Sequence, residues 1–152
     1  MHDKEKVEEL MGLFFSDDLR ICQMASFSII TIADHAIESL EPYLPRMISH
    51  YRKAPHDAFR RNVMRLFQFV DLPEELEGSV YDLCLEDFCD TKAPTAVRVF
   101  GLTTMCNICI KYPGLAQELL PILKDYQGTG TVGFENRLKK EINRISNHAK
   151  EN

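Results

Sequence analysis

The sequence predicts an all-α protein built from about four helical hairpins, and three observations support this prediction. The chain has 152 residues, of which 45% are hydrophobic and 27% charged, so it can bury a core as one domain without disulfides or metals. Apolar residues recur with the 3.6-residue period of amphipathic helices along eight segments. These segments form pairs that repeat about every 38 residues, which is typical of stacked helical repeats.

The first pair begins with an apolar stripe over residues 7–15, in which positions i, i+3, i+4, i+7 and i+8 share one face. Residues 16–18 are Ser-Asp-Asp and can cap a second helix that begins near Leu19. The segment 27–32 is rich in β-branched residues and alternates as a strand would. We nevertheless predict a helix there, because caps precede it, its register matches two later units, and tertiary context overrides local propensity.

The same layout returns three more times. Each returning pair has an apolar stripe, a short run of turn residues and a second apolar stripe. The turn residues lie near positions 54–57, 90–94 and 128–130 and include Pro or Gly each time. We interpret the chain as a single domain over residues 1–152, with hairpins at about residues 3–35, 36–72, 73–112 and 113–147.

An apolar residue followed by arginine opens three of the predicted second helices, at Arg20, Arg60 and Arg98, with spacings of 40 and 38 residues. The fourth has Glu135 instead, 37 residues further on. This pattern follows a turn that contains aspartate, and the first helices of two units carry Leu-Pro, at residues 44–45 and 120–121. In these features the sequence resembles the HEAT repeat over nearly its whole length.

The resemblance implies a short right-handed α-α superhelix of about four HEAT-like hairpins, with the first helices on its convex surface and the second helices lining its concave surface. In HEAT-like stacks the repeated arginine reaches neighbouring turn acids and forms a ladder between units. The unit with glutamate at this position is expected to be a cap. The predicted ladder consists of Arg20, Arg60 and Arg98 with Asp17, Asp57 and Asp90.

Charge differs between the two predicted layers. The second helices sum to +3 and the first helices to −9, mostly because residues 73–90 carry −7. The acidic segment is typical of a solvated outer face. The second helices carry two polar rows at i, i+4, i+7 spacing, which predict a groove of modest positive charge, with a solvated helix face as the alternative. The residues predicted to contact a partner are Arg61, Arg65, Gln68, Asn136, Lys140 and Asn143.

Two short motifs resemble sites of known chemistry. Residues 128–133 match the dinucleotide fingerprint Gly-x-Gly-x-x-Gly, but a helix precedes them where the fingerprint needs a strand, so we predict a hairpin turn. A weak anion site at the following helix, helped by Arg137, stays open. Cys106 and Cys109 have the spacing of half a zinc or redox site, yet no second half exists, and we predict core cysteines without a metal.

No coherent catalytic set is present, because the histidines fall at helix ends and turns and no Gly-x-Ser-x-Gly nucleophile motif occurs. We therefore predict a non-enzymatic interaction module with no cofactor, whose partner is an unknown protein or peptide. The net charge of −5 argues against nucleic acid. The alternative is a nucleic-acid-acting protein resembling HEAT-like alkylpurine DNA glycosylases, which use aromatic residues and an acid in a positive groove. This chain has no Trp, and only Glu135 and Glu141 are acids in its basic second helices. HEAT-like bilin lyases are a third possibility.

The start of the chain lacks the basic and then apolar layout of a secretory signal. The longest uncharged runs, residues 21–33 and 99–110, are shorter than the roughly 20 residues that a membrane helix requires. Five cysteines, an odd number, lie in apolar stretches. We therefore expect a cytoplasmic protein that does not bind membranes.

Overall fold

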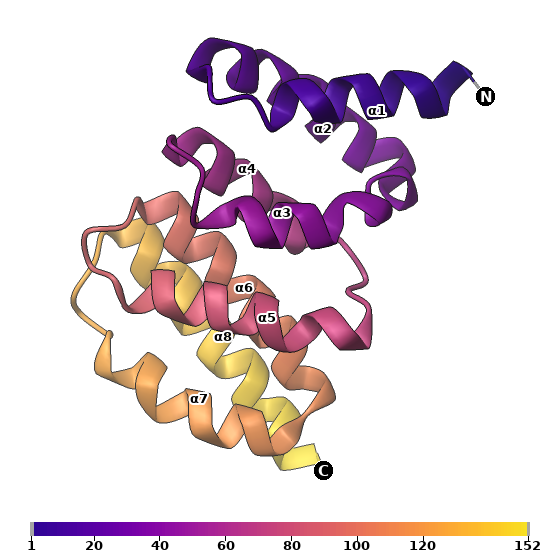
Figure 1. The fold of residues 1–152 in the computed structure, drawn as a ribbon. Coiled ribbons are helices and arrows are strands. Elements are labelled where there is room, and N and C mark those ends of the chain that lie inside the picture. The colour runs from indigo at the N-terminus through magenta and orange to yellow at the C-terminus, as the bar shows by residue number, and fades with distance from the viewer. Residues whose placement is uncertain (1, 152) are drawn as a thin grey trace. The chain divides into compact units, whose positions relative to one another are not determined.

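The computed structural model describes the backbone of residues 2–151 and the side chains of residues 3–149. Within these residues the chain forms eight α-helices and two short 3-10 helices, and no strand is present (Figure 1). This confirms the all-α prediction, including the helix over the strand-like segment 27–32. The helices are α1 (His2–Phe14), α2 (Leu19–Ala36), η1 (Ile37–Ser39), η2 (Glu41–Tyr43), α3 (Leu44–Tyr51), α4 (Asp57–Phe67), α5 (Glu74–Cys89), α6 (Thr95–Lys111), α7 (Pro113–Asp125) and α8 (Val132–Glu151).

In the second hairpin the chain between α2 and α4 is not one continuous α-helix. Residues 37–43 form the two 3-10 turns, and α3 has only eight residues. Proline explains the interruption, because Pro42 and Pro45 have no N–H to donate and each lies in the first turn of its helix, where no donor is needed. The short helix α3 still buries Met47 and Tyr51 completely.

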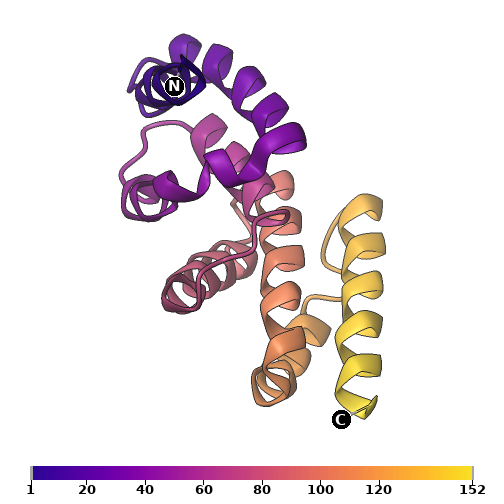
Figure 2. The same cartoon turned by 90° about the vertical axis from the view of Figure 1, so that its right-hand side faces the viewer.

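The helices group into two compact units, residues 1–80 and 81–152, and the boundary falls inside α5. In the first unit α2 packs against α1 and α4, and in the second α8 packs against α6 and α7. Figure 2 shows α8 running alongside α6. A single domain over both units stays a prediction. Among residues 2–151, no helix is both long and apolar enough to cross a membrane.

An aromatic cluster forms part of the core of the first unit. The ring of Phe59 in α4 lies 4.8 Å from that of Phe14, 5.5 Å from that of Phe15 and 5.0 Å from that of His50, measured between centroids. Contacts between tilted or edge-on rings contribute about 0.5–1.5 kcal/mol per pair beyond the area they bury. The cluster therefore fixes α3, α4 and the end of α1 against one another.

In the second unit a buried arginine contacts three aromatic rings. Arg98, in the first turn of α6, is 6% exposed. Its guanidinium carbon lies 5.5, 5.6 and 4.5 Å from the ring centroids of Phe88, Tyr126 and Phe134, and its Nε donates to the carbonyl oxygen of Phe88 at 2.9 Å. One side chain thus joins the end of α5 to the residues that flank the turn between α7 and α8.

Neighbouring turns in each unit are joined by hydrogen bonds from side chains to backbone carbonyls. In the first unit His56 Nε2 lies 2.5 Å from the carbonyl oxygen of Asp17, which can only accept. In the second unit the Tyr126 hydroxyl donates to the carbonyl oxygen of Cys89 at 3.1 Å. Both bonds link one hairpin's turn to the next, across 39 and 37 residues of sequence.

Candidate interaction surface

One of the predicted arginine–aspartate pairs forms in the structure, and it lies within a single hairpin rather than between units. Arg60 pairs with Asp57 of its own turn at 2.8 Å and donates to the Ala54 carbonyl at 2.6 Å. Arg98 donates instead to the backbone of Phe88, and Arg20 is exposed.

Of the other two acids in the predicted ladder, Asp90 bonds within its own turn and Asp17 bonds to the next turn through its backbone. The Asp90 carboxylate accepts the backbone N–H of Lys92, and Asp17 contributes its carbonyl oxygen to His56. Asp18, the neighbour of Asp17, caps α2 by accepting the N–H of Ile21 at 3.0 Å. A ladder of charged side chains between units stays a prediction.

Residues 128–131 of the glycine-rich segment lie in the turn between α7 and α8, as predicted, and residues 132 and 133 begin α8. Gly128 has a φ of 81°, which favours glycine. The Glu135 carboxylate turns back and accepts the N–H groups of Gly128 and Gly130, each at 2.9 Å. Arg137, expected to assist an anion, donates to the Thr103 hydroxyl at 2.6 Å. The Glu135 carboxylate therefore occupies the two backbone donors that an external anion would need. The structure does not support an anion site in this turn.

The stability that this turn contributes depends on pH, because its two backbone donors bond to the ionisable carboxylate of Glu135. The N–H groups of Gly128 and then Gly130 lower the pKa of Glu135 below its ordinary value of about 4.3. A lowered pKa in the folded state stabilises the protein above the unfolded-state pKa, and this contribution is lost as the pH falls through the folded value. We expect Glu135→Ala to lower the melting temperature at pH 7 and the difference from wild type to shrink below about pH 4.3. Glu118→Ala, on the exposed surface of α7, is the control and should leave melting unchanged at both pH values.

Gly130 is a second determinant of this turn. A Cβ atom there would lie 2.4 Å from Cδ1 and 2.7 Å from Cγ of Phe134, whose ring is 1% exposed and stacks on Phe88. Because the ring has no space to move, we expect Gly130→Ala to lower the free energy of unfolding by about 2 kcal/mol in urea titrations. Gly133→Ala is the matched control, since its Cβ would meet nothing within 4 Å and alanine favours the helix. Equal losses in the two variants would contradict this account.

The cysteines are core residues. Cys106 and Cys109 are 0% and 1% exposed and are not joined by a disulfide. Burial raises the pKa of the Cys109 thiol to about 12 and also raises that of Cys106, where Glu141 adds to the effect. Both are therefore protonated thiols at neutral pH, whereas nucleophiles and metal ligands need the thiolate. In the part of the chain that the structure describes, no three His, Cys, Asp or Glu side chains are grouped to hold a metal ion.

The first predicted polar row lies on α4 and its C-cap. Arg61 and Arg65 are exposed, and Gln68, half-buried, donates to the carbonyl oxygen of Arg65 at 3.2 Å. Phe59 and Val63 on the same helix are 2% and 0% exposed. The three polar residues share one face by their i, i+4, i+7 spacing, so the structure brings them together within the first unit.

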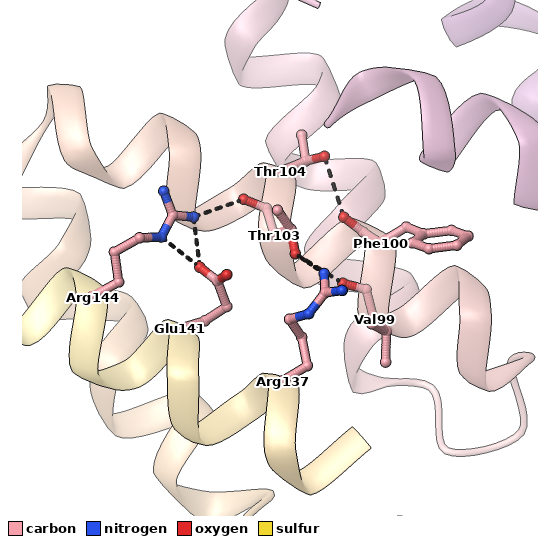
Figure 3. A network of polar contacts seen from close by, with 7 residues as sticks. All are labelled: Val99, Phe100, Thr103, Thr104, Arg137, Glu141 and Arg144. Atoms are coloured by element: carbon pink, nitrogen blue, oxygen red, sulfur yellow. Dashed lines mark hydrogen bonds and ion pairs between the residues drawn. The ribbon is translucent and has the colours of Figure 1, made fainter. Parts of the chain in front are cut away.

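The second predicted row lies on α8, where Asn136, Lys140 and Asn143 are all exposed. Two arginines on the same helix have a different environment. Arg137 reaches Thr103, and Arg144 forms an ion pair with Glu141, a residue 2% exposed, and donates to the Thr103 carbonyl at 3.3 Å (Figure 3). On α8, Arg137 and Arg144 are thus held by α6 or by Glu141, whereas Lys140 faces solvent.

The helix pairs, the turn contacts and the arginine positions agree with one repeat family. A family model described as a HEAT repeat domain matches residues 1–144. The chain belongs to the HEAT repeat family. No curated protein and no solved structure matches the chain significantly. The HEAT model extends over all four helix pairs, as far as residue 144 within α8, which confirms the resemblance drawn from the sequence.

Two features were missed by the sequence analysis. The pair of Glu141 and Arg144 has the i, i+3 spacing of an ordinary surface pair, and nothing in the sequence marks Glu141 as buried. The second feature is an exposed apolar surface on α2, where Met24 and Phe27 are 65% and 78% exposed. The uncharged run over residues 21–33 was a usable signal, because apolar residues on both sides of one helix cannot all face the same core.

Proposed function

We propose that this HEAT repeat protein is a non-enzymatic interaction module, whose partner is a protein or peptide contacted by the polar rows of α4 and α8. The observation that carries the proposal is the division of cations on α8. Arg137 and Arg144 are engaged in packing, whereas Lys140 faces solvent between two asparagines. The α4 row repeats this arrangement, with Arg60 held by Asp57 and its neighbours Arg61 and Arg65 exposed.

The chemistry of the rows favours an acidic peptide. Arginine and lysine donate to carboxylates, and the exposed amides of Asn136 and Asn143 can pair with a peptide backbone. The three cations of the two rows, Arg61, Arg65 and Lys140, can neutralise at most about three phosphates, which gives weak binding of the rows to nucleic acid at physiological salt. Burial keeps the Cys106 and Cys109 thiols protonated, so these two side chains are not nucleophiles at neutral pH.

The test uses immobilised protein and a displayed library of random peptides, with fluorescein-labelled duplex DNA as the competing probe. We expect the selected peptides to be rich in Asp and Glu. Arg61→Glu combined with Lys140→Glu should weaken the selected peptides by at least about tenfold, which corresponds to 1.4 kcal/mol. The helical circular dichroism and melting temperature should stay nearly unchanged, because exposed charges contribute little to stability.

The matched control is Glu74→Lys with Glu75→Lys, two exposed acids in the first turn of α5. This variant should bind the selected peptides as the wild type does. Each single reversal, Arg61→Glu and Lys140→Glu, reports one row separately. The proposal is wrong if binding survives the double reversal and is lost in the α5 variant. It is also wrong if duplex DNA binds more tightly than any peptide and its affinity falls steeply with salt.

A further inference from the structure

The exposed side of α2 carries large apolar side chains that no part of the proposed function uses. Its core side is formed by Cys22, Ala25 and Ile29, which are at most 4% exposed. Met24 and Phe27 lie on the opposite side of the helix and are 65% and 78% exposed. The corresponding solvent side of α8 is polar, as the outer face of a terminal repeat ought to be. Apolar groups concentrated on an exposed helix face mark an interaction site.

Residues of opposite charge lie at the two ends of this exposed face of α2. Arg20, Met24, Phe27, Thr31 and Asp34 follow one another at spacings of four, three, four and three residues, so they lie along one side of α2, and all five are exposed. Arg20 and Asp34 are separated by roughly 21 Å along the helix axis. Phe27 is seven residues from each of them. The two opposite charges therefore lie at equal distances on either side of Phe27.

We infer that α2 is a dimerisation helix, which packs antiparallel against α2 of a second copy with Phe27 at the two-fold axis. In this arrangement Arg20 of each copy faces Asp34 of the other, and Met24 of each copy lies against the segment around Thr31 of the other. A parallel arrangement would place Arg20 beside Arg20 and Asp34 beside Asp34, which like-charge repulsion disfavours. A two-fold interface requires a self-complementary patch, and the charge order along α2 supplies it.

The size of the face sets the strength of the dimer. One pair of helices buries less than the roughly 1,200 Å² of a standard stable interface. The dimer is therefore expected to form and dissociate over micromolar concentrations. This inference stands apart from the proposed function, because the polar rows on α4 and α8 include no residue of α2.

The test is sedimentation equilibrium of the full chain at about 10–500 µM, a range chosen for a weak interface. Wild type should show a monomer–dimer equilibrium. Arg20→Asp and Asp34→Arg, each alone, should raise the dissociation constant at least about tenfold, because each brings like charges together at both ends of the interface. The double variant, with the two charges exchanged, should dimerise as the wild type does.

Mixing the two single variants gives the sharpest readout. Each should dimerise weakly alone, but one presents only negative ends and the other only positive ends, so the mixture should form a heterodimer more tightly than either variant self-associates. Phe27→Glu should abolish dimerisation, whereas Phe69→Glu, which changes another exposed phenylalanine (64%), should not. All these positions are exposed, and circular dichroism should report unchanged helix content. The inference is overturned if wild type is monomeric over the whole range, if dimers persist in Phe27→Glu, or if the mixed variants remain monomers.

Discussion

Replacing Arg144 by methionine is expected to lower the free energy of unfolding by about 3 kcal/mol at pH 7, because it leaves a buried carboxylate without its cation. The Glu141 side chain is 3% exposed, and its Oε2 lies 2.5 Å from Nη2 and 2.8 Å from Nε of Arg144. Arg144 is itself 31% exposed, so the loss should fall at the lower end of the range for buried pairs. Urea denaturation followed by circular dichroism measures it.

Two companion variants separate the ion pair from other effects. Adding Glu141→Gln to Arg144→Met removes the unpaired charge and should recover a substantial part of the loss, because the remaining amide is neutral. Lys140→Met, at an exposed position of the same helix, should change stability by less than about 0.5 kcal/mol. A loss in Arg144→Met that Glu141→Gln does not reduce would assign the effect to packing of the arginine stem.

Replacing Arg98 by alanine is expected to cost about 3 kcal/mol, and we attribute the loss to packing more than to charge. The substitution empties the space between Phe88, Tyr126 and Phe134, as other large-to-small changes in cores do. Contacts with three rings and one charged hydrogen bond stabilise the guanidinium by several kcal/mol, but removing it from water costs a similar amount. The electrostatic terms therefore nearly cancel.

This division predicts different outcomes for two further variants. Arg98→Met fills most of the same volume and should restore stability to within about 1 kcal/mol of wild type. Arg98→Lys keeps the charge but places a strongly hydrated ammonium in the aromatic site, and it should be less stable than Arg98→Met. The reverse order would show that the charge dominates at this position. Thermal and urea unfolding of the three variants decide between the two accounts.

Apolar periodicity was sufficient to predict most of the helices. The stripe in residues 7–15 and the capping residues before Leu19 correspond to α1 and α2, and even the β-branched segment 27–32 is helical. Apolar periodicity made no prediction for residues 37–43, where Pro42 lies in a 3-10 turn. A stripe reports which residues can share a face, but it does not report where the backbone hydrogen bonds stop.

The candidate surface was only partly predictable for a different reason. Spacing placed Arg61 and Arg65, and separately Asn136 and Lys140, on exposed helix faces. Spacing could not show that Glu135 closes the glycine turn. Contacts of this kind depend on how segments meet in space, and a single sequence carries no record of them beyond residue type.

The hydrogen bonds that join neighbouring turns have a consequence for how this fold tolerates mutation. His56 and Tyr126 both bond to main-chain carbonyl oxygens, of Asp17 and Cys89. Every amino acid supplies that oxygen, so no substitution at position 17 or 89 can delete the acceptor. Only a change of the donor, at position 56 or 126, can therefore remove the bonding group itself. Neighbouring turns can thus stay joined when the acidic residues around them are replaced.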